Sequence, residues 1–111
     1  MAQIRGRNFN TNDSASVTEI TTNPTTSTTA AAANKDRTYL HIDNNSNVTG
    51  VWVKLQAATE DDDKKGIYLS KNIAAEAPGT TYWEMTPDNI YTGEVSVIAD
   101  SGTPSVHVTE Y

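Results

Sequence analysis

Alternation of apolar and polar residues runs through residues 38–111 and constrains the fold more than any other feature of this chain. From Thr38 onward, apolar residues recur at every second position in six short runs. A strand buried on one face has this period, because successive side chains point to opposite faces. Residues typical of turns, such as Asn, Pro and Gly, separate the runs. The pattern predicts an all-β fold, either an antiparallel β-sandwich or a jelly-roll-like small barrel.

The predicted core consists of the apolar residues on the inward side of these runs. They number thirteen: Leu40, Ile42, Val51, Val53, Leu55, Ile67, Leu69, Trp83, Met85, Val95, Val97, Val106 and Val108. So small a core, in a chain without cysteine, commonly gains stability through association. We therefore expect a homo-oligomer (a trimer or a dimer) or a subunit held on a larger assembly.

Residues 1–33 differ from the rest of the chain in composition. Their large apolar side chains are few: Met1, Ile4, Phe9, Val17 and Ile20. Residues 21–33 read TTNPTTSTTAAAA, and Thr and Pro both disfavour a helix there. The β-branched residues from Val17 to Ile20 predict one short strand. We expect residues 1–33 to form an extended N-terminal arm or linker, and residues 34–111 to form the β-sandwich domain.

Charge and composition exclude several classes of function. The net charge of −6 argues against nucleic-acid binding, because phosphate contacts come from clustered Lys and Arg. No window approaches the roughly 18 consecutive apolar residues of a membrane-spanning helix. Without cysteine there is no disulfide or thiolate metal site. No set of nucleophile, base and orienting residue can be assembled, so we expect neither an enzyme nor a cofactor.

Two groups of residues are candidates for a metal site. His41 and His107 fall on the outward side of their strands and would need a neighbouring carboxylate to complete a metal site, so two exposed histidines are the favoured interpretation. The run Glu60-Asp61-Asp62-Asp63 lacks the spacing of a calcium loop and is followed by two lysines. We expect it to be a solvated loop, with weak Ca²⁺ binding at 60–63 left open.

Paired carboxylates for glycoside hydrolysis would have to come from Glu76, Glu84, Glu94 and Glu110. An acid catalyst needs a raised pKa in an apolar surrounding, and Glu84 beside Trp83 comes nearest. Adjacent strand residues point to opposite faces, however, so a structural role for these carboxylates is favoured.

The outward aromatic residues are the most informative candidates for a binding surface. Tyr39, Trp52, Tyr68 and Tyr82 all take the solvent side of their predicted strands. Such a set favours a contact surface for another protein, for a second subunit or for sugar rings. Packing of these rings across neighbouring strands is the alternative.

The leading segment carries a second candidate for partner contact. Arg5, Arg7 and Phe9 make it basic, with one aromatic anchor. Such an arm can pair with an acidic surface or add a strand to the edge of a subunit. An unstructured start of the chain is the alternative.

Residues 34–46 read NKDRTYLHIDNNS, with an Asn-x-x-Arg lead-in, alternating apolar residues and a closing Asn-x-Ser. Four further segments follow in order: GIYL at 66–69, APG at 77–79, YTGEVSVI at 91–98 and VHVTE at 106–110. As an ordered set they resemble small auxiliary virion proteins of tailed bacteriophages. The acidic run at 60–65 is more charged than that pattern, and residues 1–33 lie outside it.

The resemblance implies a β-sandwich that sits on the capsid as a decoration or cement subunit, usually as a symmetric oligomer. The expected partner is the major capsid protein or another virion protein, and the expected location is the virion, after synthesis in the cytoplasm of the bacterial host. The alternative is a tail, fibre or adhesion module that binds host glycan through the exposed aromatic residues.

Overall fold

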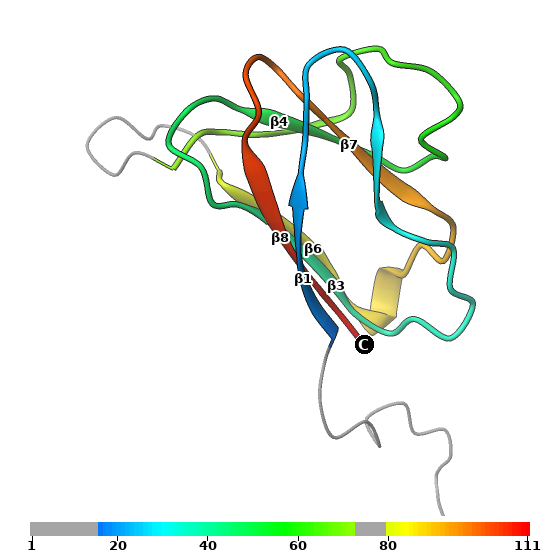
Figure 1. Ribbon diagram of the computed structural model, residues 1–111. Helices are drawn as coiled ribbons and strands as arrows, with labels where there is room; N and C mark the ends of the chain where they lie inside the picture. Colours follow the sequence, from blue (N-terminus) through cyan, green and yellow to red (C-terminus); the bar gives the residue numbers. More distant parts are fainter. Residues whose placement is uncertain (1–15, 73–79) are drawn as a thin grey trace, which may run out of the picture.

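The computed structural model describes residues 16–72 and 80–111 and shows strands linked by turns and loops (Figure 1). The strands are β1 (Ser16–Thr21), β2 (Thr28–Ala31), β3 (Leu40–Asn44), β4 (Val51–Lys54), β5 (Ile67–Leu69), β6 (Tyr82–Met85), β7 (Val95–Ala99) and β8 (Ser105–Glu110). One short 3-10 helix, η2 (Pro87–Asn89), follows β6. The prediction of an all-β fold is confirmed.

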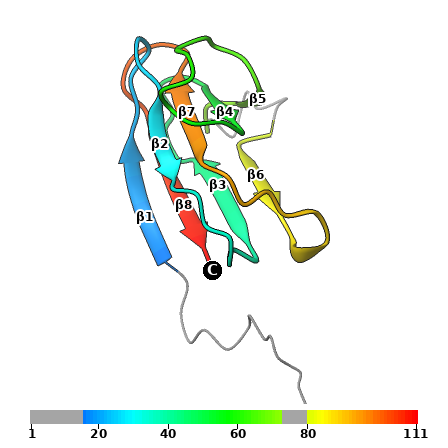
Figure 2. The same ribbon diagram turned by 90° about the vertical axis from the view of Figure 1, so that its right-hand side faces the viewer.

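The strands form two four-stranded antiparallel sheets, seen as two layers in Figure 2. Sheet A has the order β1-β8-β3-β6, and sheet B has the order β2-β7-β4-β5. Strand β1 pairs with β8, β2 with β7, β3 with β6 and β4 with β5, as if one long hairpin had been rolled up. This arrangement of eight strands in two sheets is that of a jelly roll.

The core lies between the sheets and follows the predicted alternation closely. Ten of the thirteen predicted residues are buried, and Ile67 and Trp83 are partly buried against them. The prediction for Leu55 was wrong, because this side chain is 42% exposed. Strand β4 ends at Lys54, so the alternation of faces does not extend to the next residue.

Residues 16–31 differ from the expected arm, because both strands in this segment belong to the jelly roll. Strand β1 pairs with β8 over all six of its residues, which confirms the short strand predicted at Val17–Ile20. Strand β2 comes from the Thr/Ala tract and pairs with β7, with an irregular register between Thr29 and Ala31. Ala30 and Ala31 are buried in the core, where small side chains fit beneath the neighbouring strands. Both strands therefore lie before residue 33, where the boundary between the arm and the β-sandwich domain was expected.

The turn between β1 and β2 is built by local hydrogen bonds. The Asn23 side-chain oxygen accepts bonds from the backbone N–H groups of Thr25 (3.0 Å) and Thr26 (2.8 Å). An Asn side chain that bonds to the backbone two or three residues ahead stabilises a turn, and the neighbouring Pro24 restricts the backbone further. This turn carries the chain from sheet A to sheet B.

Candidate interaction surface

Aromatic rings gather on the outer side of sheet A, facing away from the core. We call Tyr39, His41, Tyr82 and Tyr111 the aromatic face. Tyr39 stacks on Tyr111 with ring centroids 4.9 Å apart, and His41 stacks on Tyr82 at 5.3 Å. Tyr39 and His41 lie 6.5 Å apart and nearly parallel, so they join the two pairs into one row.

Strand register explains why these four residues meet. Tyr39 and Tyr111 exchange backbone hydrogen bonds at the ends of β3 and β8. On the other side of β3, His41 lies opposite Glu84 and Asp43 lies opposite Tyr82 on β6. Side chains on one face of neighbouring antiparallel strands contact each other both directly and diagonally. Tyr82, at 47% exposed, leaves much of its ring available to a partner.

The Tyr39 phenol is held as a hydrogen-bond donor. Its hydroxyl donates to the Glu84 carboxylate at 3.0 Å. Burial raises the pKa of Tyr39, and the bond to the neighbouring negative charge of Glu84 raises it further. The phenol therefore stays neutral well into the alkaline range, and the face keeps its hydrogen-bonding pattern there.

The two histidines both lie on the outer side of sheet A, as their strand parity predicts, but they do not form a pair. His107 lies opposite Asp43 on β3 and opposite Glu19 on β1, whose carboxylate is 3.9 Å from Nε2. His41 instead stacks on Tyr82. Within residues 16–72 and 80–111, no three His, Asp or Glu side chains are grouped to hold a metal ion.

The other two predicted contact residues lie on sheet B, so the four outward aromatic residues do not make one surface. Trp52 on β4 lies directly opposite Tyr68 on β5, with ring centroids 4.9 Å apart and planes tilted by 57°. The Trp52 indole N–H donates to Asp100 at 3.5 Å. A Cβ at Gly50 would collide with the Tyr68 ring, so this glycine makes room for the pair. Cross-strand packing of these rings, the alternative left open by the sequence, accounts for Trp52 and Tyr68.

The third group of predicted contact residues, Arg5, Arg7 and Phe9, lies outside the described residues. Two members of the aromatic face were not named as contact residues from the sequence. Tyr111 continues the outward parity of His107 and Thr109 on β8, so extension of the alternation to the end of the chain would have found it. His41 was assigned to the correct side but was expected to be a single exposed histidine, with a metal site as the alternative, and not a member of an aromatic row.

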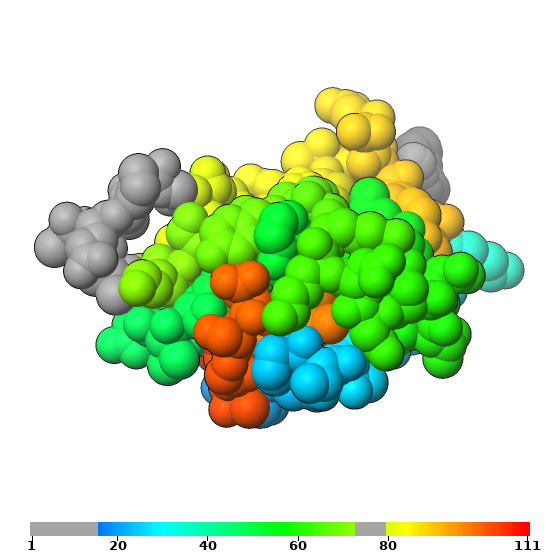
Figure 3. Space-filling model, turned by 90° about the horizontal axis from the view of Figure 1, so that it is seen from above, coloured from blue at the N-terminus to red at the C-terminus, as the bar shows by residue number. Residues whose placement is uncertain are grey.

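The acidic run is an exposed loop, as the sequence predicts, and it also surrounds a buried lysine. Lys54 points away from the core, yet its side chain is only 2% exposed, because residues 55–66 cover it. Its ammonium donates to the carboxylate of Asp61 (3.0 Å) and to the carbonyl oxygens of Asp61 (3.1 Å) and Asp63 (2.9 Å). The Ser27 backbone N–H and hydroxyl bond to the same loop. Figure 3 shows this segment in green, packed onto its neighbours.

The oxygens of this loop that face inward are thus directed at an internal cation. Lys65 also bonds to Asp61, at 2.9 Å. Hydrogen bonds from Lys65 and then from Lys54 hold the pKa of Asp61 far below its ordinary value of 3.8. The Asp61 carboxylate is thus shared between two lysine ammonium groups.

The remaining carboxylates named as catalytic candidates have structural partners, and Glu76 lies outside the described residues. Glu110 pairs with the buried Arg37, and Glu84 accepts the Tyr39 hydroxyl. Glu94 accepts bonds from the Ala58 N–H (2.9 Å) and the Thr29 hydroxyl (2.7 Å). These bonds lower the pKa of Glu94, the opposite of what an acid catalyst needs.

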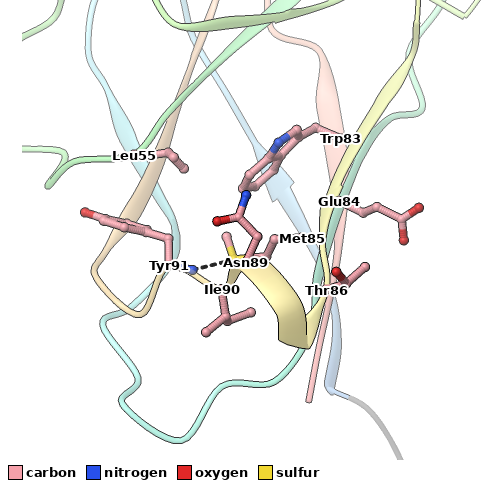
Figure 4. A pocket seen from close by; sticks show the side chains of 8 residues that line it. All are labelled: Leu55, Trp83, Glu84, Met85, Thr86, Asn89, Ile90 and Tyr91. Carbon is pink, nitrogen blue, oxygen red and sulfur yellow. Dashed lines mark hydrogen bonds between the residues drawn. The ribbon is translucent and has the colours of Figure 1, made fainter.

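An open pocket of about 480 Å³ lies beside β6 and η2 (Figure 4). Its lining combines apolar and polar side chains: Leu55, Trp83, Glu84, Met85, Thr86, Asn89, Ile90 and Tyr91. In the close view Glu84 points away from the other side chains, while the Tyr91 N–H donates to the Met85 sulfur at 3.1 Å. The volume is within the range of small-ligand sites, roughly 300–1,000 Å³. Exposed Leu55, which the sequence assigned to the core, forms one wall.

Comparison of the chain with protein-family models, with curated proteins and with solved structures finds no match in any of the three. Within the described parts of the chain, no helix is long and apolar enough to cross a membrane.

Proposed function

We propose that this chain is a structural protein of a virion: a decoration or cement subunit that binds the major capsid protein shell and stabilises it. The observation that carries the proposal is the aromatic face, a row of stacked rings on the outer side of a double-sheet jelly roll. Jelly rolls are frequent in viral capsid and lectin domains. Because one fold serves many functions, the aromatic face and not the fold alone supports this proposal.

The chemistry of the aromatic face fits a protein partner. Tyrosine is enriched at the centres of protein interfaces, where a large ring and a hydroxyl act together. The carboxylates of Glu19, Asp43 and Glu84 lie on the same outer side of sheet A. Arginine side chains complement such a surface, because guanidinium groups pair with carboxylates and stack on aromatic rings. The expected contact on the shell is therefore rich in arginine.

A small contact area per copy is sufficient in this role. A shell presents the same site many times, and subunits that associate with each other bind several sites at once. The aromatic face of one copy need only supply a few ring contacts. Stabilisation of the shell follows when one subunit, or one oligomer, spans neighbouring capsid proteins.

Binding to purified capsid shells of the virus that encodes the chain tests the proposal. Tyr82→Ala removes the most exposed ring of the aromatic face, and Tyr68→Ala on sheet B is its matched control, with a similar exposure of 44% against 47%. Loss of a central interface tyrosine costs about 2 kcal/mol, or roughly thirtyfold in Kd. We expect that loss for Tyr82→Ala and none for Tyr68→Ala, with wild-type binding weakened by salt. Equal occupancy by wild type and Tyr82→Ala at limiting concentration contradicts the proposal.

An adhesion module that binds host glycan is the second candidate, favoured by the open pocket at Trp83 and by the exposed rings. Aromatic faces stack on sugar rings, and polar groups such as Asn89 would fix the orientation of a ring. A glycan screen separates the two functions. Saturable sugar binding that is lost in Trp83→Ala or Trp52→Ala supports adhesion, whereas shell binding with no response in the screen supports decoration.

A further inference from the structure

Strand β1 lies at the open side of sheet A (Figure 2). It pairs with β8 on one side, and no strand in the described parts of the chain pairs with its other side. The Thr22 N–H donates to the Pro104 carbonyl at 3.0 Å, and this bond determines which residues of β1 direct their backbone groups toward β8. Because bonding alternates along an antiparallel ladder, the N–H and C=O groups of Val17, Glu19 and Thr21 point away from β8.

Within the described residues, strand β1 lacks most of the features that protect a sheet edge from pairing. Proteins protect edges with very short strands, irregular register, proline or lysine. Strands β5 and β6 have three and four residues, and β2 has an irregular register, whereas β1 has six residues in regular register. Its sequence, SVTEIT, contains neither proline nor lysine. Val17 on its outer side is 68% exposed.

Charge also favours approach of a second copy at this edge. The chain carries a net charge of −6, so two copies repel each other over most of their surfaces. Residues 14–34, which include β1 and β2, contain Glu19 as their single charged residue. Two copies can therefore meet along β1 at little electrostatic cost.

We propose that two copies of this chain pair through β1, antiparallel and about a two-fold axis, so that two sheets A become one continuous sheet. The inference deepens the oligomer expected for the proposed virion protein, and it places both aromatic faces on the same side. Residues that lie directly opposite each other must point to the same face of the sheet, so the two-fold axis passes at a residue and not between two residues. The two candidates at the middle of β1 are Thr18 and Glu19. Centring on Glu19 sets two carboxylates opposite each other, which is unfavourable. Centring on Thr18 sets Val17 opposite Glu19 of the second copy.

The register centred on Thr18 uses the outward groups of the edge. Val17 and Glu19 of each copy then form two hydrogen-bonded pairs with Glu19 and Val17 of the other, and each pair exchanges two backbone bonds. Between them, the two Thr18 residues face each other as a close, non-hydrogen-bonded pair. Their Cα atoms lie about 4.5 Å apart, within the range that a disulfide spans.

Single-cysteine variants test this register directly, because the chain has no cysteine of its own. Thr18→Cys is expected to give a disulfide-linked dimer under mild oxidation. Glu19→Cys is the matched control: its two Cα atoms would lie more than about 7 Å apart, too far for a disulfide. Cross-linking of Glu19→Cys instead of Thr18→Cys, or of neither variant, overturns the proposal.

Light scattering on the full chain without cysteine gives the second measurement. We expect a mass of about twice the 12.0 kDa of one chain. Glu19→Pro removes an outward N–H and leaves the bonds to β8 in place, and proline is tolerated at such edge positions. It is expected to give a folded monomer by circular dichroism. A wild-type monomer or trimer overturns the proposal, and since no capsid is used, the outcome is separate from that of the shell-binding test.

Discussion

At the scale of single residues, two buried cations hold loops and strand ends together. The Arg37 Nε donates to Glu110 at 2.7 Å, and its other nitrogens donate to the carbonyl oxygens of Ala32, Tyr91 and Gly93. Lys54 does the same for the acidic loop on the other sheet. These carbonyl groups can be buried away from water because the cation donates hydrogen bonds to them.

Replacement of Arg37 is expected to destabilise the fold strongly. Arg37→Met keeps much of the side-chain volume but leaves three carbonyl oxygens without the Arg37 donor, and Glu110 then keeps only the longer bond from the Asn34 amide at 3.3 Å. Removal of one partner from a buried ion pair costs about 3 kcal/mol or more. Urea unfolding followed by tryptophan fluorescence measures the change. Lys35→Met, at an exposed neighbouring position, is the control, and an equal midpoint for the two variants would refute the role of Arg37.

Asp61 is expected to make stability depend on acid pH. Its folded-state pKa is lowered by Lys65 and Lys54, so its contribution to the free energy of unfolding is fully present above the ordinary value of 3.8. The contribution is lost as pH falls below that value towards the folded-state pKa. Asp61→Asn should therefore be less stable than wild type at neutral pH, and the difference should shrink in acid. Asp36→Asn is the exposed control, and a difference that grows as pH falls would contradict this account.

At the scale of elements, the sequence predicts strands well where one face is apolar. Runs such as Leu40-His41-Ile42 alternate because each meets the core on one side. Strand β2 has no such run, and it forms because β7 offers an edge and because Ala30 and Ala31 fit beneath it. Local composition does not report on a partner strand that is more than sixty residues away. The arrangement of the acidic loop around Lys54 could not be foreseen for the same reason, since Lys54 is in position to bond to the loop only when β4 has formed.

Truncation distinguishes the strands from the segment that precedes them. A chain that lacks residues 1–15 keeps all described elements and is the reference for the urea midpoint. A chain that lacks residues 1–33 loses β1 and β2 and leaves β8 and β7 as unpaired edges. We expect a lower midpoint and aggregation for this chain. Equal stability of the two truncated chains would show that β1 and β2 do not contribute to the jelly roll.

At the scale of the whole molecule, alternation predicts which residues face outward but not which of them meet. Tyr39, Trp52, Tyr68 and Tyr82 share the outward parity, and the strand order then divides them between two sheets. Parity is a property of one strand, whereas a surface depends on the order of strands in a sheet. That order results from the rolled hairpin of the jelly roll. The sequence pattern favours this class of fold but does not specify which strands pair.

The aromatic face therefore emerges only at this scale, where β3, β6 and β8 lie side by side. If β1 pairs two copies, the dimer presents two such faces in one direction. A binding unit of this form suits a lattice in which equivalent sites repeat. The proposed function, the contact surface and the dimer together determine how each copy would be oriented on the shell.

The most direct test is an image reconstruction of capsids with the bound chain, at a resolution that places the strands. We expect density at defined lattice positions, with sheet A and its Tyr82 side toward the shell and the edge of β1 toward a second copy. Shells without such density, or copies seated through the Trp52 and Tyr68 side of sheet B, would contradict it.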